Sequence, residues 1–223
     1  DERPRRAPAG APMRALYLAR HGQSVANAVR RFQGVQDVPL SELGLRQAAA
    51  LGAALRARPP ARVYSSPLER ARRTAEAVAA ALARPMTVVD DLRELSLGEW
   101  EGRTVEEVRA LPGDPYARWI RDPVEHCPPG GEPLDLVQAR VVSAIAAIAA
   151  EHPNGDDVLV VAHGGVISAY LAHWLGLPLS SIWRITVSNC SLSLVAPPRV
   201  LSVNETAHLA SVDGTGGGAP LSP

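Results

Sequence analysis

Two histidines in this sequence each follow a run of β-forming residues and are followed at once by glycine. They stand in the segments Arg20-His21-Gly22 and His163-Gly164-Gly165. A histidine can act as a nucleophile or exchange protons near neutral pH, and an adjacent glycine lets a ligand approach the backbone closely. A single histidine of this kind is more often a hydrogen-bonded structural residue. Two of them in matching positions favour chemistry.

Two further charged side chains occupy comparable places. Arg70 follows an apolar segment at residues 61–64, and Glu94 follows another at residues 86–89. Arg20 and Arg70 would supply planar donors that match phosphate oxygens, and Glu94 would supply a carboxyl group for proton transfer. The free N–H groups of a helix that starts after His163 would also favour an anion. The pattern therefore predicts an anion site equipped for acid–base chemistry.

The elements that would position these residues alternate between strand and helix. Apolar, β-rich runs predict strands over residues 14–19, 61–64, 86–89, 158–162, 190–195 and 200–203. Helical spacing predicts helices over residues 42–58, 68–83, 104–111, 133–151 and 164–175, with Ser41 and Ser66 as N-caps. This alternation predicts an α/β fold, a three-layer α/β/α sandwich with a mostly parallel central sheet. In such sheets ligands bind at the carboxyl ends of the strands.

Length and composition fit one globular domain with short tails. The chain has 223 residues, of which 46% are hydrophobic and 21% charged, values typical of soluble proteins. We expect the domain over residues 13–209, with residues 90–132 as a lid or substrate-side insertion. Residues 1–12 and 210–223 are rich in proline and glycine and are expected to be disordered tails.

Charge and motif content exclude several classes of function. The 23 basic residues, all arginine, balance 23 acidic ones, which argues against a nucleic-acid partner. No apolar run approaches the roughly 20 residues that span a bilayer, and the start lacks the apolar stretch of a signal peptide. Cys127 and Cys190 are far apart, so we expect reduced thiols and a cytoplasmic protein without a membrane partner. The sequence leaves a homodimer open.

Other catalytic motifs are missing from the sequence. It has no HxH or HExxH pattern, no GxSxG elbow, no Walker loop and no GxGxxG. We therefore expect no metal and no cofactor, and neither a serine hydrolase nor a nucleotide-binding protein of those types. An ordinary phosphate-binding site remains.

Short motifs follow one another in a fixed order from about Met13 to Leu209. They are Leu18-Ala-Arg-His-Gly-Gln-Ser-Val-Ala-Asn27, Phe32-Gln-Gly34, Ser41-Glu-Leu-Gly44, Ser65-Ser-Pro-Leu-Glu-Arg-Ala71, Thr74-Ala75, Glu94, Gly98-Glu-Trp-Glu-Gly102, Gly130-Gly-Glu132 and His163-Gly-Gly165. This ordered set resembles the histidine phosphatase superfamily, in its phosphoglycerate-mutase-like branch. The Arg-His-Gly triplet alone would be weak evidence. The ordered set is highly specific.

The resemblance implies a role for each site residue. His21 would be the nucleophile that becomes phosphorylated, and Glu94 the proton donor, ahead of Glu99 and Glu101. The expected catalytic residues are His21, Glu94, Arg20, Arg70 and His163, and the expected substrate-binding residues are Arg20, Asn27, Gln33, Gly34, Arg70, His163 and Gly164. The chemistry further predicts that His21 donates its other ring proton to a backbone carbonyl. It also predicts a protonated His163 that stabilises the charge on the phosphoryl oxygens.

Phosphatase and mutase share such a site, and the sequence favours the phosphatase. Mutases of this type carry a longer insertion after the proton donor, with a lysine and an arginine pair for the substrate carboxylate. This chain has no lysine, and Arg118 and Arg121 are separated by Trp119-Ile120. We expect a metal-independent phosphomonoesterase acting on a small phosphomonoester. The alternatives are a cofactor-dependent phosphoglycerate mutase and a non-catalytic phosphate-binding relative.

The substrate stays open among the phosphatases. The short loop around Trp100 is similar to broad-specificity and α-ribazole phosphatases, and the segment 204–209 is similar to the end of metal-independent phosphoserine phosphatases. Leu97, however, stands where the last group carries a histidine. Candidate residues for the mouth of the site are Phe32, Trp100, Tyr116, Trp119, His126 and His208.

Overall fold

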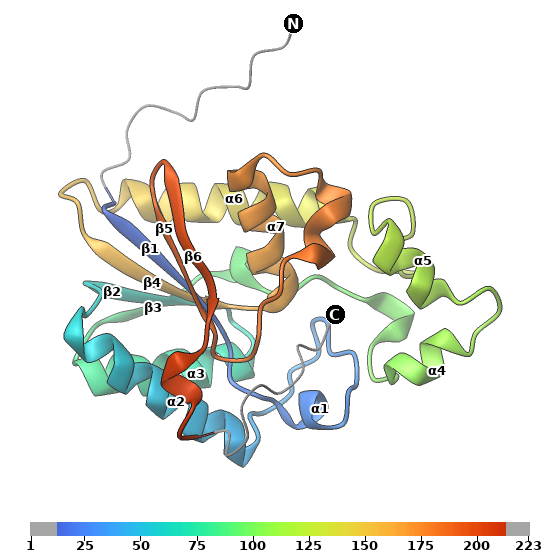
Figure 1. Ribbon diagram of the computed structural model, residues 1–223, viewed down its shortest axis with the longest axis horizontal. Helices are drawn as coiled ribbons and strands as arrows, with labels where there is room; N and C mark the ends of the chain where they lie inside the picture. The colour runs from blue at the N-terminus through green and yellow to red at the C-terminus, as the bar shows by residue number, and fades with distance from the viewer. Residues whose placement is uncertain (1–12, 213–223) are drawn as a thin grey trace, which may run out of the picture.

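A six-stranded sheet forms the centre of the protein in a computed structural model that describes residues 13–212 (Figure 1). The strands are β1 Ala15–Arg20, β2 Arg62–Ser65, β3 Met86–Val88, β4 Asp157–Ala162, β5 Leu192–Ala196 and β6 Arg199–Glu205. Their order is β3-β2-β4-β1-β5-β6. The strands β3, β2, β4 and β1 pair in parallel, and β5 and β6 add antiparallel pairs. The predicted mostly parallel sheet is confirmed.

Helices cover both faces of the sheet, so the predicted three layers are confirmed as well. The helices α2 Glu42–Ala54 and α3 Glu69–Leu82 lie below the sheet in Figure 1, whereas α6 Leu134–Ala150 and α7 Gly164–Leu175 lie above it. Successive residues of a strand point to opposite faces. Accordingly, Leu16 and Leu18 of β1 pack in the core with α6 and α7, whereas Tyr17 and Ala19 pack in the core with α2 and α3.

Two predicted boundaries are wrong for identifiable reasons. Ser66 is not a helix N-cap, because α3 begins at Glu69 after Leu68 and the Ser66 hydroxyl contacts His163 instead. The strand predicted from residue 190 begins at Leu192. Cys190 has a left-handed backbone with φ 52°, and its N–H points to the carbonyls of Arg20 and His21.

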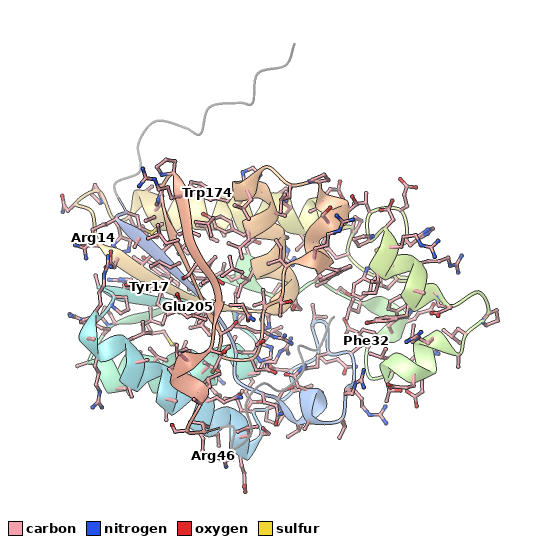
Figure 2. All side chains as sticks on the ribbon, viewed as in Figure 1. Arg14, Tyr17, Phe32, Arg46, Trp174 and Glu205 are labelled. Atoms are coloured by element: carbon pink, nitrogen blue, oxygen red, sulfur yellow. The ribbon has the colours of Figure 1, made fainter. Side chains whose placement is uncertain are left out.

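Short helices that the sequence pattern did not reveal lie around the end of the sheet. They are α1 Val25–Ala28 and α5 Pro115–Arg121; the expected helix near residue 104 is α4 Val105–Arg109. The helices α4 and α5 lie beside each other to the right of the sheet in Figure 1. Phe32 lies on this side of the molecule, whereas Arg14, the residue before β1, lies at the opposite end (Figure 2).

The two predicted tails lie largely outside the described residues. Residues 1–12 and 213–223 are outside the described part of the chain. Residues 210–212 are described and follow a short 3₁₀ turn at Ala207–Leu209. Within residues 13–212, no helix combines the length and the apolar character that a bilayer crossing requires.

Candidate active site

The two histidines meet because their strands are neighbours. Arg20 at the end of β1 stands opposite Ala162 at the end of β4 in the parallel register, so the next residue of each strand, His21 or His163, emerges at the same edge. Their ring centroids are 5.1 Å apart, and both side chains are buried. The sequence prediction that these residues come together is confirmed.

The hydrogen bonds of His21 leave one ring nitrogen ready to attack. Its Nδ1 lies 2.7 Å from the carbonyl oxygen of Gly22, and because a carbonyl only accepts, Nδ1 must carry the proton. Nε2 therefore keeps its lone pair, which receives a hydrogen bond of 3.3 Å from Nε of Arg70. Burial and the charges of Arg70 and Arg20 hold the pKa of His21 well below its usual range. His21 is a neutral imidazole, as a nucleophile requires.

The surroundings of His163 oppose the charged form of its ring, whereas the chemistry predicted a protonated ring. Burial is the largest cause that lowers the pKa of His163, and the charge of Arg70, the ring of His21 and the charge of Arg20 lower it further. Its Nε2 lies 2.7 Å from Oγ of Ser66. Among the described residues, its Nδ1 has no hydrogen-bond partner although it is buried, and the same is true of Nε of Arg20. Buried polar atoms without partners are rare in proteins, so these two atoms are candidates to bind a ligand.

Loop carbonyls fix the orientation of the arginine at the start of α3. Arg70 donates from Nη1 to the carbonyl of Gln36 at 2.7 Å and from Nη2 to the carbonyl of Gly34 at 2.8 Å. Gly34 was expected to bind substrate, and the structure shows its carbonyl holding Arg70. Burial lowers the pKa of Arg70 to about 10, so the guanidinium remains charged at neutral pH.

Glu101 fastens this loop to the segment that follows Glu94. Its Oε1 accepts hydrogen bonds from the N–H groups of Val35 at 3.1 Å and Leu97 at 3.0 Å. A Cβ at Gly34 would collide with this carboxylate. Glu101 therefore has a structural role, in line with its lower rank as a proton donor.

The amide of Asn27 is oriented by its neighbours. Its Oδ1 accepts from the N–H of Ser24 at 3.1 Å and from Nδ2 of Asn189 at 3.2 Å, which leaves the Asn27 amino group to face the pocket that it lines. Gln33 is arranged in the same way, because its Oε1 accepts from the Ser24 hydroxyl at 2.7 Å. Both amides therefore present N–H donors, which suit phosphate oxygens.

The carboxylate of Glu94 lies at the N-terminus of α7. Its two oxygens accept from the N–H of Leu95 at 3.0 Å and from the N–H of Gly165 at 3.2 Å. A Cβ at Gly165 would lie 2.8 Å from Oε1 of Glu94 and 2.3 Å from Cδ2 of Leu95. Only glycine at this position lets the carboxylate come so close. The helix N-terminus, expected to face the anion, thus also holds the expected proton donor.

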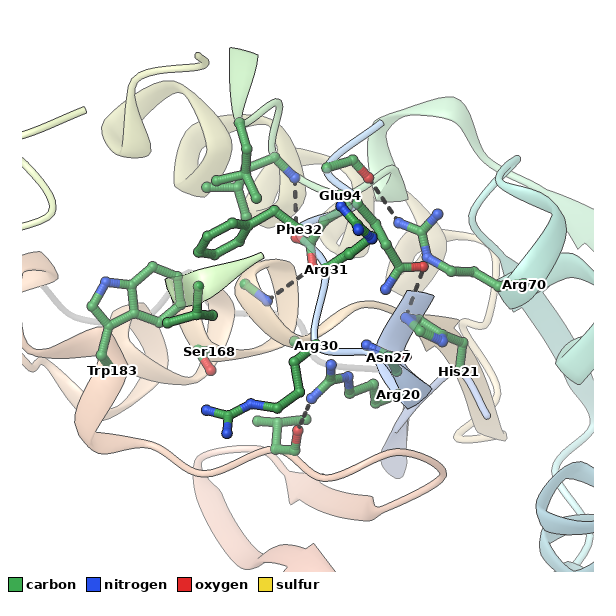
Figure 3. A pocket seen from close by; sticks show the side chains of 18 of the residues that line it. Arg20, His21, Asn27, Arg30, Arg31, Phe32, Arg70, Glu94, Ser168 and Trp183 are labelled. Atoms are coloured by element: carbon green, nitrogen blue, oxygen red, sulfur yellow. Dashed lines mark hydrogen bonds between the residues drawn. The ribbon is translucent and has the colours of Figure 1, made fainter. Parts of the chain in front are cut away.

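One pocket brings these groups together with apolar side chains (Figure 3). Its lining includes the polar side chains of Arg20, His21, Asn27, Arg70 and Glu94, and also Arg30, Arg31, Phe32, Leu97, Val105, Trp119, Trp183, Ile185 and Thr186. Of the six aromatic or histidine candidates for the mouth, Phe32 and Trp119 line the pocket; Trp100, Tyr116, His126 and His208 are not among its lining residues within the described chain. Gln33, Gly34 and Gly164 line it as well.

Sequence reasoning missed several residues of the site. They are Ser66, Ser168, Trp183, Ile185, Val187 and Asn189. Ser66 had a usable signal, because it directly follows strand β2, where parallel sheets place ligands. Val187, whose carbonyl accepts from Nη1 of Arg20 at 2.6 Å, had no such signal in the sequence.

Within residues 13–212, no three His, Cys, Asp or Glu side chains are grouped as a metal site requires.

The histidines of the site, His21 and His163, predict stability that decreases in acid. In the unfolded chain each histidine returns to a pKa of about 6.5, whereas both folded-state pKa values lie well below it. The unfolded state therefore binds more protons below about pH 6.5, and the free energy of unfolding decreases as the pH falls from there towards the folded-state values. Above about pH 6.5 both states are neutral and this contribution is constant.

We expect urea unfolding to show this decrease between about pH 7 and about pH 5, at up to about 1.4 kcal/mol per pH unit for each histidine. The variant His163→Gln should have a flatter pH dependence, because one of the two groups is gone. His173 lies exposed on α7, so His173→Gln is the matched control and should keep the wild-type slope. An equal slope in all three proteins would contradict the prediction.

Comparison with known proteins identifies the class to which this fold and site belong. The sequence profile of the Histidine phosphatase superfamily (branch 1) matches residues 16–199. The chain belongs to this superfamily.

Individual relatives are similar over nearly their whole length. The chain is 34% identical to adenosylcobalamin/alpha-ribazole phosphatase of Salmonella typhimurium, over 77% of this chain and 85% of the relative. It is also 34% identical to phosphoserine phosphatase 1 of Hydrogenobacter thermophilus, over 87% of this chain and 93% of the relative. A mycobacterial glucosyl-3-phosphoglycerate phosphatase, solved as a complex with VO3, has 33% identity and a TM-score of 0.81, covering 86% of this chain and all of that chain (100%).

Proposed function

We propose that the protein is a cytoplasmic, metal-independent phosphomonoesterase that hydrolyses small phosphorylated metabolites through a phosphohistidine intermediate. The arrangement around His21 carries this proposal. Its Nε2 keeps a lone pair, because Nδ1 donates to the Gly22 carbonyl, and it lies beside the guanidinium of Arg70. Nucleophile, anion-binding cations and a carboxyl group are thus present in one pocket. The phosphatase names of the relatives support the same reaction.

In the first step, Nε2 of His21 attacks phosphorus and forms the P–N bond while the bond to the leaving oxygen breaks. Glu94, in its protonated form, gives its proton to that oxygen, so the product leaves as an alcohol. In the second step, the ionised Glu94 takes a proton from water, and the resulting hydroxide attacks phosphorus. The P–N bond breaks, phosphate leaves, and His21 and protonated Glu94 are restored.

The remaining groups stabilise charge on the phosphoryl oxygens, the main task in phosphoryl transfer. Arg20, Arg70 and the amide of Asn27 supply donors on several sides. A neutral His163 can also donate a hydrogen bond to the phosphoryl group. The hydroxyl oxygen of Ser66 accepts from the N–H of Leu68 at 3.3 Å, so the hydroxyl proton of Ser66 can be donated to Nε2 of His163. The ring proton of His163 then sits on Nδ1. This nitrogen is the buried atom without a partner.

The apolar side chains of the pocket support a small leaving group with an apolar part. Phe32, Val105, Trp119, Trp183 and Ile185 form apolar walls, while Arg30 and Arg31 line the same pocket. Apolar walls with few polar groups are typical of metabolite sites. The chain has no lysine, which supports hydrolysis rather than phosphoglycerate mutation. Arg30 and Arg31 could pair with a second anionic group of the substrate.

The test is phosphate release from a panel of phosphomonoesters in the presence of EDTA. The panel contains 4-nitrophenyl phosphate, phosphoserine, α-ribazole phosphate, glucosyl-3-phosphoglycerate, 3-phosphoglycerate and sugar phosphates. We expect hydrolysis that EDTA does not reduce, with a ranking that identifies the leaving group. Interconversion of phosphoglycerates after priming with bisphosphoglycerate, without phosphate release, would establish the mutase instead. Phosphate binding without either reaction would establish a non-catalytic relative.

A further inference from the structure

Arg140 of α6 uses all five of its N–H donors on the segments around Glu94. Its Nη1 donates to the carbonyls of Asp91 at 2.6 Å and Arg93 at 2.7 Å, and its Nη2 donates to the carbonyl of Glu94 at 3.2 Å. The other two donors, on Nε and Nη2, form a bidentate pair with Glu132 at 2.8 and 2.9 Å. A guanidinium has five donors in one plane. Because all five donors of Arg140 are bonded, its position and orientation are fixed.

Glu132 is equally well anchored. Its N–H donates to the carbonyl of Ser96 at 2.9 Å, and its side chain is largely buried, with 16% exposed. Burial opposes its charged form, but the hydrogen bonds and charge of Arg140 outweigh this and keep the pKa of Glu132 below its usual value. We call Glu132 and Arg140 together the Glu132–Arg140 clasp.

Two glycines allow the clasp to reach its target. A Cβ at Gly98 would lie 2.1 Å from the carbonyl oxygen of Pro129, and a Cβ at Gly131 would lie 2.9 Å from that of Ser96. The backbone at residues 96–98 therefore packs directly on residues 129–131. This close packing places Glu132 next to the segment that carries Glu94.

The backbone and the side chain of Glu94 are held from different directions. Helix α7 and Leu95 hold the carboxylate, while the clasp holds the carbonyls of residues 91, 93 and 94. Neither Arg140 nor Glu132 is among the residues that line the pocket of the described chain, and the five N–H donors of Arg140 are all bonded to protein oxygens.

We propose that the Glu132–Arg140 clasp positions Glu94 for proton transfer to the leaving oxygen. The proposal rests on the proposed function, because it concerns the proton donor of that reaction. A displacement of about 1 Å at a reacting group can lower a rate by about 100-fold. Glu94 acts in both steps, but kcat/KM reports only the step that phosphorylates His21, so loss of the clasp should lower kcat/KM according to the need of each substrate for a proton.

The test compares leaving groups of different basicity. An alkyl phosphate leaves as a strongly basic alkoxide and needs the proton, whereas 4-nitrophenyl phosphate leaves as a stable phenolate. In Arg140→Met we expect kcat/KM for an alkyl phosphate to fall on the order of 100-fold, with a much smaller loss for 4-nitrophenyl phosphate. Across a series of aryl phosphates, log(kcat/KM) should depend more steeply on leaving-group pKa than in the wild type.

Two milder variants keep the test valid if Arg140→Met does not fold. Arg140→Lys keeps the charge but loses the planar fork, and Glu132→Gln keeps the shape of the partner but loses its charge. Both should steepen the leaving-group dependence in the same direction, by less. Arg58→Met is the control, because Arg58 pairs with the buried Asp157 at 2.9 Å at the start of β4, the end remote from His163. It should leave the dependence unchanged.

A double variant separates positioning from general structural support. If the clasp acts through Glu94, Arg140→Met should have little further effect on an alkyl phosphate once Glu94→Gln is present, so the two effects should not add. Equal losses on all leaving groups, or additive effects in the double variant, would overturn the proposal while phosphatase activity stands. A wild-type protein that hydrolyses no phosphomonoester would overturn the proposed function and this inference together.

Discussion

Replacing His21 by alanine is expected to lower phosphatase turnover by on the order of 10⁵- to 10⁶-fold, the size of loss seen when a catalytic nucleophile is removed. His163 is not expected to take over the attack. It lies near, but its Nε2 lone pair accepts from Ser66 at 2.7 Å and its Nδ1 then carries the ring proton, so neither nitrogen has a free lone pair. Water could attack phosphorus directly, without the phosphoryl-enzyme that divides the reaction into two easier steps.

The measurement is a rapid quench in base with a substrate labelled in the phosphoryl group. A phosphohistidine survives base and is lost in acid, so the wild type should carry base-stable, acid-labile label, and His21→Ala should carry none. His173→Ala, on the exposed surface of α7, is the matched control and should keep both label and turnover. Label retained in His21→Ala would assign the nucleophile to another residue.

Much of the site could be predicted because it depends on strand ends. A residue that directly follows a parallel strand appears at one edge of the sheet, whatever the order of the strands. His21 and His163 are such residues, and the register of β1 and β4 brings them together. The sequence pattern did not contain that order, in which β4 lies between β2 and β1.

The remaining features depend on contacts between distant side chains. Ser66 stands before a proline, a common start of a helix, but a contact with His163, 97 residues away, prevails. Arg140 has the appearance of an ordinary helical surface residue, and only the fold shows that its side chain is 10% exposed and surrounded by carbonyl oxygens. The surroundings that lower the pKa of His163, burial and the nearby arginines, likewise come together only in the fold.

Replacing Glu94 by glutamine should separate the two chemical steps, with a loss on the order of 10²- to 10⁴-fold for alkyl phosphates. Glutamine has nearly the shape of glutamate, and its carbonyl oxygen can still accept from the N–H of Leu95 or Gly165. It can neither supply a proton to an alkoxide nor take one from water. With 4-nitrophenyl phosphate, whose leaving group needs no proton, His21 should still be phosphorylated, but the phosphohistidine should then wait for an unactivated water.

Stopped-flow recording of nitrophenolate release should therefore show a burst close to one equivalent per enzyme in Glu94→Gln, followed by slow turnover. Glu99→Gln, an exposed carboxylate in the same segment, is the control and should behave as the wild type. A variant without a burst, with equal losses on alkyl and aryl phosphates, would show that Glu94 contributes only charge. The burst distinguishes the two roles because a purely electrostatic group would slow phosphorylation itself, so no intermediate could accumulate.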